Sequence, residues 1–102
     1  MSRLAKIQER LAAEPNDAFL NYSYAMELSK AGEMEQARQA FARVRQIDAN
    51  YVPAYFQEGQ MLAGQGFVPE AQQILREGIA VAKLTGDTHA LGEMTEFLDS
   101  LT

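Results

Sequence analysis

The chain has 102 residues, of which 47% are hydrophobic, so it can bury one core and we expect a single domain over residues 1–102. Its formal net charge of -5 disfavours binding to nucleic acid or to anionic membranes, which are themselves negative. The absence of cysteine excludes disulfides and thiolate metal sites, and no apolar run approaches the roughly 20 residues that span a bilayer. We therefore expect a soluble cytoplasmic protein with neither a nucleic-acid nor a membrane partner.

Residues 2–14 predict an amphipathic helix. Leu4, Ile7 and Leu11 recur at helical spacing and form an apolar face. A separate stripe of the same segment is basic and consists of Arg3, Lys6 and Arg10. Because Ile7 matches Phe41 in the next part of the chain, the segment is interpreted as the second half of a preceding repeat.

Residues 17–50 predict two helices joined by a tight turn. Apolar residues recur at helical spacing up to Ala31, and either Asn16 or Asp17 can accept a hydrogen bond from the first turn. Gly32 suits the left-handed conformation that ends a helix. The inner face of the second helix is formed by Met34, Ala37, Phe41 and Val44.

Residues 51–84 repeat this plan. Landmarks recur 34 residues later, in the pairs Gly32 and Gly66, Ala37 and Ala71, and Phe41 and Leu75. Proline is expected in the first turn of both helices, at Pro53 and Pro69. Small residues let the helices of each pair approach closely, at Ala25, Gly59, Ala37, Ala71 and Gly78. Since one helical hairpin cannot bury both of its faces, the units are expected to stack.

Residues 87–101 predict a final helix that caps the stack. Its apolar face consists of Leu91, Met94, Leu98 and Leu101, and its acidic face of Glu93, Glu96 and Asp99. The basic first helix and the acidic last helix could guide head-to-tail association, although ordinary solvated faces account for both stripes.

These hairpins resemble the tetratricopeptide repeat family over nearly the whole chain, and the chain is similar to small stand-alone bacterial proteins of that family. The resemblance is carried by the small residue of each first helix, the turn glycine, the alanine of each second helix and the large apolar residue that follows it: Ala25 and Gly59, Gly32 and Gly66, Ala37 and Ala71, Phe41 and Leu75. It implies an all-α fold, in which antiparallel helical hairpins stack as a short right-handed superhelix with a C-terminal capping helix.

Two residues depart from the family pattern. Asn21 stands where the family usually has a large aromatic residue, and Glu58 stands where it prefers leucine. A buried lone carboxylate is costly, so Glu58 is expected to reach solvent or to pair with an arginine of the adjacent helix. The alternative is that Glu58 contributes a polar group to a binding surface.

The sequence shows no pattern of catalytic residues. His89 is the only histidine, and no second nitrogen or sulfur ligand accompanies it. The serines lack the context of a nucleophile, and the fourteen acidic residues single out no acid/base pair. We expect no enzyme, no metal site and no cofactor.

The resemblance also implies a concave groove, lined by the first helices of successive hairpins, that receives a peptide or helix of a partner protein. By position, the partner-binding candidates are Phe19, Tyr22, Met26, Phe56, Gln57 and Gln60. This set is aromatic and largely uncharged, and Tyr22, Met26 and Phe56 are the expected anchors. Two alternatives stay open: Phe19 completes the core against the first helix, or the same surface binds a second copy, as a homodimer or a subunit of a larger complex. The last helix could also cover the groove.

Overall fold

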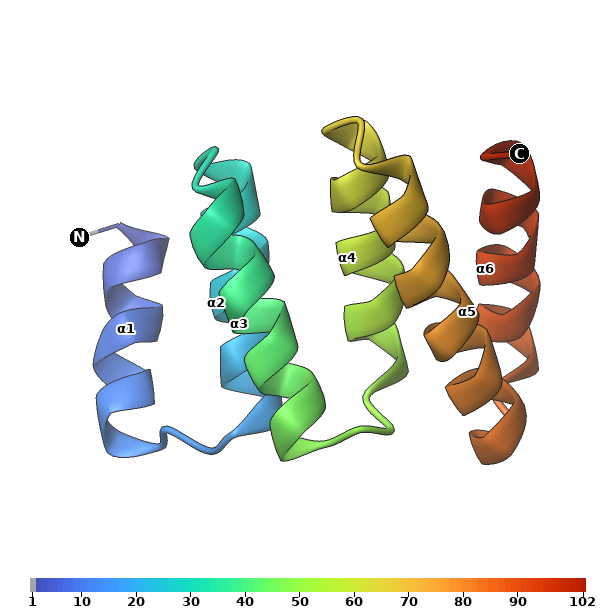
Figure 1. Ribbon diagram of the computed structural model, residues 1–102. Helices are drawn as coiled ribbons and strands as arrows, with labels where there is room; N and C mark the ends of the chain where they lie inside the picture. Colours follow the sequence, from blue (N-terminus) through green and yellow to red (C-terminus); the bar gives the residue numbers. More distant parts are fainter. Residues whose placement is uncertain (1) are drawn as a thin grey trace. The chain divides into compact units, whose positions relative to one another are not determined.

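The computed structural model describes residues 2–102, and this part of the chain is all-α (Figure 1). Its helices are α1 (Arg3–Ala13), α2 (Ala18–Lys30), α3 (Met34–Ile47), α4 (Val52–Gly64), α5 (Val68–Thr85) and α6 (Thr88–Ser100). None of these helices combines the length and the apolar character needed to cross a bilayer. The expectation of an all-α fold of helical hairpins is confirmed.

The chain divides between Ala49 and Asn50 into two compact units. In the first unit, α2 and α3 form a hairpin and α1 packs on α2. In the second unit, α4 and α5 form a hairpin, and α6 packs on α5 and also touches α4. Each unit therefore contains one complete hairpin and one additional helix.

The helix starts follow from local chemistry. Of the two candidate caps of α2, Asp17 makes the contact, because its Oδ1 accepts a hydrogen bond from the N–H of Leu20 at 2.8 Å. Pro53 and Pro69 lie in the first turns of α4 and α5, where a missing N–H leaves no helical hydrogen bond unmade. The predicted proline positions are confirmed.

The two predicted turns are closed by glycine in the left-handed conformation. Gly32 has φ of 82° and Gly66 has φ of 86°. In both turns the N–H of the following residue donates to a carbonyl in the last turn of the preceding helix, at 2.9 Å. The turn between helices is thus the same in both hairpins.

The core of the first unit is centred on Phe41. This side chain is 1% exposed, and its ring meets the edge of Tyr22 with the ring centroids 6.4 Å apart. Ala25 and Ala37 are fully buried, which brings α2 and α3 close together. Ile7 of α1 also belongs to this core and buries the apolar face of that helix.

The core of the second unit requires glycine at its tightest point. A Cβ atom added to Gly78 of α5 would lie 2.5 Å from the Cβ of Tyr55 and 2.7 Å from the Sδ of Met94. Neither distance is sterically tolerable, so α5 passes α4 and α6 at a separation that excludes a side chain at this position. The predicted close approach at Gly78 is confirmed, as is that at Gly59, whose Cβ would meet Leu75 at 2.7 Å.

Asn21 stands where an aromatic residue is expected, and its side chain makes two hydrogen bonds to the backbone. It is 7% exposed, and its Nδ2 donates to the carbonyls of Pro15 and Asp17 at 3.0 and 2.8 Å. These two carbonyls belong to the connection between α1 and α2. Asn21 therefore fixes the path of the chain between the additional helix and the hairpin of the first unit.

Replacing Asn21 with alanine is expected to lower the free energy of unfolding by about 0.5–1.5 kcal/mol, the net contribution of a protein hydrogen bond. Asn21→Asp keeps the shape but cannot donate, so it should destabilise at least as much. Urea denaturation followed by circular dichroism measures both changes. Two variants as stable as the wild type would show that these hydrogen bonds do not hold the connection.

Glu58 does not reach solvent, and this part of its expectation is wrong. Its exposed fraction is 3%, because the residue lies on a buried side of α4 together with Ala54, Tyr55 and Met61. No buried side-chain nitrogen or oxygen among residues 2–102 lacks a hydrogen-bond partner. The carboxylate is accordingly part of the interior and is not available at the surface.

Candidate protein-binding surface

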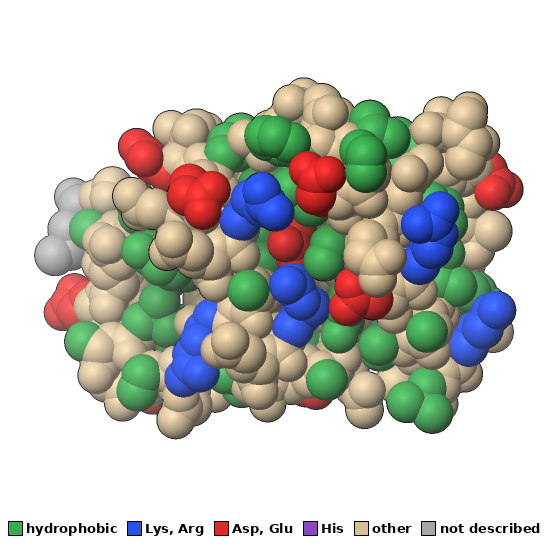
Figure 2. All heavy atoms as spheres, in the orientation of Figure 1, with side chains coloured by type: hydrophobic (Ala, Val, Ile, Leu, Met, Phe, Trp, Pro, Cys, Tyr) green, Lys and Arg blue, Asp and Glu red, His purple; other side chains and the backbone are tan. Residues whose placement is uncertain are grey.

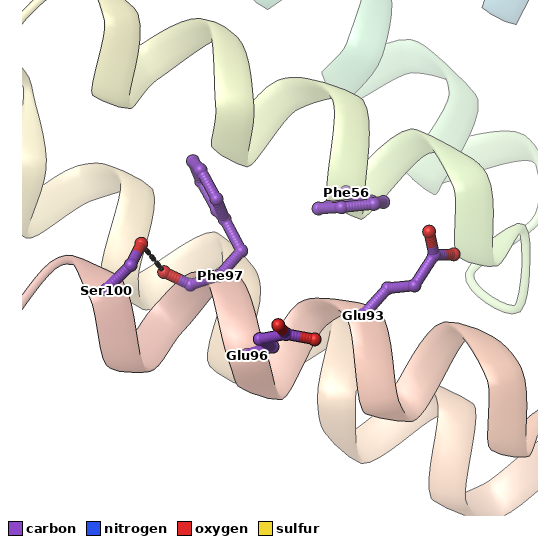
Figure 3. Close-up of a pocket in the computed structure, with 5 residues that line it drawn as sticks. All are labelled: Phe56, Glu93, Glu96, Phe97 and Ser100. Carbon is purple, nitrogen blue, oxygen red and sulfur yellow. Dashed lines mark hydrogen bonds between the residues drawn. The ribbon is translucent and has the colours of Figure 1, made fainter.

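A hollow of about 330 Å³ lies on the second unit and is lined by residues of α4 and α6. Its aromatic part is formed by Phe56 of α4 and Phe97 of α6, whose rings meet edge to face with their centroids 6.0 Å apart. Figure 3 shows both rings in the space between the two helices. Both are partly buried, so they support the core and also present ring surface to an incoming group.

The rim of this hollow is acidic. Glu93 and Glu96 of α6 border it, and Ser100 closes one end with its hydroxyl donating to the Phe97 carbonyl at 2.6 Å (Figure 3). No basic side chain among residues 2–102 lines the hollow. An apolar floor with a negative rim suits an apolar side chain that is followed by a positive charge.

A neighbouring hollow of about 320 Å³ continues this surface toward the start of the two helices. It shares Phe56 and Glu93 with the first hollow and adds Gln57 on α4, His89 on α6 and Asp87, which directly precedes α6. The His89 side chain contacts Glu93, because its Nε2 lies 3.2 Å from Glu93 Oε1. The α4 and α6 side of the second unit thus presents a continuous strip of partly buried rings, an amide and carboxylates.

The structure places the six candidate residues in four settings. Phe56 and Gln57 line the hollows between α4 and α6, whereas Gln60 is exposed on α4 and lines neither of them. Tyr22 and Met26 are half-buried on α2, and the Tyr22 ring is engaged by Phe41. Each of these five residues lies on a first helix of a hairpin.

Phe19 has the fourth setting, and it does not complete the core. Phe19 is 62% exposed. It lines a hollow of about 290 Å³ between α1 and α2 together with three basic residues, Arg3, Lys6 and Arg10. The alternative in which Phe19 packs as a core residue is therefore wrong.

Sequence reasoning missed the contribution of α6. Its acidic face was interpreted as solvated, and Phe97 was not singled out. The 34-residue offset gives no signal for this contribution, because it pairs the unlike residues Phe56 and Ala90, and from the start of α4 at Val52 it leads to Gly86, whereas α6 begins at Thr88. The last helix covers part of the predicted groove. α6 touches α4, and its Phe97 ring meets the Phe56 ring.

The described residues offer no metal centre. Among residues 2–102, no group of three or more histidine, aspartate or glutamate side chains is placed to hold a metal ion.

On the face shown in Figure 2, apolar side chains are scattered among charged and neutral polar ones.

Comparisons with known proteins agree with this architecture, although no protein-family model matches the chain. The chain is 28% identical over 95 residues to the TPR repeat-containing protein PA0015 of Pseudomonas aeruginosa, covering 93% of this chain and 90% of that protein. A tetratricopeptide repeat domain protein of Salinibacter ruber superposes with a TM-score of 0.75 at 25% identity, over 83% of this chain and 94% of that one. Protein BPP2914 of Bordetella parapertussis shares the fold, with a TM-score of 0.86 at 23% identity, over 99% of this chain and 88% of that one.

Proposed function

Because the chain is a tetratricopeptide repeat protein, we propose that it is a non-enzymatic interaction module that binds a peptide or helix of a partner protein through its first helices. The observation that carries the proposal is the hollow between α4 and α6, where Phe56 and Phe97 present ring surface beside two carboxylates. Tyr22 and Met26 of α2 are the further contacts proposed for the first unit.

The chemistry of the hollow supports a narrower class of partner than the sequence alone does. The set of groove residues on α2 and α4 is largely uncharged, but the α6 side adds Glu93 and Glu96. A neutral apolar segment would offer no positive charge to Glu96, and Glu93 has only the His89 imidazole beside it, whereas a lysine or arginine next to an apolar anchor would pair with these carboxylates. We therefore propose a basic partner segment with an aromatic or aliphatic anchor side chain.

The proposal is tested by filling the hollow from its exposed end. Ser100 is exposed and lines the hollow, so Ser100→Trp places a large ring there without removing a core side chain. Peptides selected from a display library on the wild-type protein are measured by calorimetry against this variant. We expect affinity to fall by about tenfold or more, because the variant occupies the anchor position.

The matched control is Thr95→Trp, which adds the same ring on an exposed position of α6 that lines neither hollow. This variant should bind the selected peptides as the wild type does. Selected peptides without basic residues would contradict the proposed partner chemistry. Peptides that bind Ser100→Trp with unchanged affinity would place the binding site elsewhere.

A further inference from the structure

The first unit carries a basic hollow of about 290 Å³ between α1 and α2, on a chain whose formal net charge is -5. Arg3, Lys6 and Arg10 of α1 border this basic hollow, and no acidic side chain among residues 2–102 lines it. Its charge is therefore opposite in sign to the net charge of the protein and to the rim of the hollow between α4 and α6.

Two of the three cations have no counter-charge within the described chain. Arg3 pairs with Glu27 of α2, where its Nε lies 2.7 Å from Oε1, and the Nζ of Lys30 lies 3.7 Å from the same oxygen. The Glu27 carboxylate is thus shared between two cations already. Lys6 and Arg10 make no ion pair among residues 2–102. Their charges are available to a carboxylate from outside the chain.

The rest of the basic hollow is largely apolar. Ile7 of α1 and Leu20 of α2 line it as buried residues, and Phe19 lines it as an exposed one. A ring that lies outside the core and beside a hollow is placed to contact an incoming side chain. The volume is at the lower end of the range for ligand pockets, about 300–1,000 Å³, so the hollow suits one anchor side chain.

We propose that the basic hollow binds an acidic segment of a partner protein, in which two carboxylates stand beside an apolar anchor side chain. The anchor contacts Ile7, Leu20 and the Phe19 ring, and the carboxylates pair with Lys6 and Arg10. Charge complementarity is what favours this occupant, because the two free cations lie next to apolar surface. The two units of the chain would then recognise segments of opposite charge.

The spacing of the two free cations indicates how the carboxylates are arranged. Lys6 and Arg10 are four residues apart on α1, which is about 6 Å along the helix axis. In an extended segment, alternate side chains point to the same side and lie about 6.6 Å apart. Two acidic residues separated by one residue therefore match the two cations. The next alternate position on the same side carries the anchor.

The same features disfavour nucleic acid and anionic membranes as occupants. Binding to a phosphate backbone depends on many cation contacts, whereas this surface offers two free cations on a chain of net charge -5. Attachment to a lipid surface needs a broad apolar face, and a single exposed ring does not provide one. A short acidic segment with one anchor uses both the charges and the ring.

Chemical-shift changes in isotope-labelled protein test the proposal and locate the binding site. Two end-blocked peptides contain Phe-Ala-Glu-Ala-Glu and its reverse, and matched peptides carry glutamine in place of both glutamates. At low salt, we expect a glutamate peptide to shift amide signals of α1 and α2. Its affinity should exceed that of its glutamine counterpart by about fivefold or more, because two ion pairs are lost. High salt should reduce this difference.

Charge reversal on α1 provides the matching change in the protein. Lys6→Glu with Arg10→Glu should lose the glutamate peptides and should bind, at α1 and α2, peptides with lysine in place of glutamate. The control is Arg76→Glu with Lys83→Glu, which reverses two exposed cations of α5 that line neither the basic hollow nor those beside α6. This control should bind the glutamate peptides as the wild type does.

Two further variants keep the test decisive. Phe19→Ala removes the exposed ring and should weaken binding of the glutamate peptides while the charges stay in place. Circular dichroism checks the helical content of each variant. If the reversed variant fails to fold, Lys6→Gln with Arg10→Gln replaces it and should likewise lose the preference for glutamate over glutamine peptides.

Three results would overturn the proposal. The first is the absence of shifts in α1 and α2 with either glutamate peptide at millimolar concentration. The second is equal affinity for glutamate and glutamine peptides, or glutamate-peptide binding that persists in the folded reversed variant. The third is stronger binding of oligothymidylate or of phosphatidylserine vesicles at the same amides, which would assign the basic hollow to phosphate groups.

The inference does not depend on the proposed site between α4 and α6. In the wild-type protein, the lysine peptides are expected to shift signals of α4 and α6, and the glutamate peptides those of α1 and α2. Because each signal belongs to one residue, failure of either site is observed separately from failure of the other.

Discussion

Replacing Phe41 with alanine is expected to lower the free energy of unfolding of the first unit by about 3–5 kcal/mol. The ring is 1% exposed and lies between α2 and α3, where it also meets Tyr22. Its removal loses the transfer free energy of the side chain and leaves a cavity that the closely packed interior cannot fully fill. Urea denaturation followed by circular dichroism measures the loss, and native-state hydrogen exchange should locate it in α1, α2 and α3.

The matched control is the same substitution at Phe19. This residue is 62% exposed, so Phe19→Ala removes little buried surface and should change stability by less than about 0.5 kcal/mol. A large loss of stability in Phe19→Ala would mean that the ring packs as a core residue after all. A small loss in Phe41→Ala would mean that the first unit is not held together by the hairpin core.

Gly78→Ala is expected to destabilise the second unit by about 1–3 kcal/mol. The new methyl group would lie 2.5 Å from the Cβ of Tyr55, which cannot move without its backbone, and 2.7 Å from the Sδ of Met94. Either α5 moves away from α4 or Met94 leaves its place, and both changes loosen the core. The destabilisation should outweigh the gain of up to about 1 kcal/mol that alanine brings to a helix.

Gly92→Ala provides a control of the opposite sign. Gly92 is an exposed residue of α6, and a Cβ atom at this position would meet nothing within 4 Å. Alanine should therefore stabilise α6 by about 0.5–1 kcal/mol through its helix propensity alone. The two variants differ in sign only because of what surrounds each glycine, so equal shifts in denaturation midpoint would contradict the close packing at Gly78.

The features that the sequence predicted are those that depend on a few neighbouring residues. The left-handed turns at Gly32 and Gly66 depend on local backbone conformation, and the start of α2 depends on one carboxylate, although only the structure distinguishes Asp17 from Asn16. The alternation of buried and exposed positions on each helix likewise follows from a period that can be counted along the chain.

The features that the sequence did not predict depend on how helices pack. The exposure of Phe19 depends on how far α1 extends over α2, and the burial of Glu58 depends on which side of α4 is covered. The pairing of Phe56 with Phe97 joins residues 41 positions apart on different helices, so no local pattern indicates it. A hydrophobic residue near the end of an amphipathic helix has the same local pattern whether it seals a core or lines a hollow.

The order of the helices within each unit has a consequence for how the chain folds. α1 contacts α2, α2 contacts α3, α4 contacts α5, and α6 contacts the two helices that precede it, so within each unit every contact joins helices that are adjacent or separated by one helix. Folding therefore closes only short loops, whose entropic cost is small, and proteins with such local contacts fold within microseconds to milliseconds. Residues 2–49 are synthesised first and contain all the contacts of the first hairpin, so this unit can begin to fold before the second unit is complete.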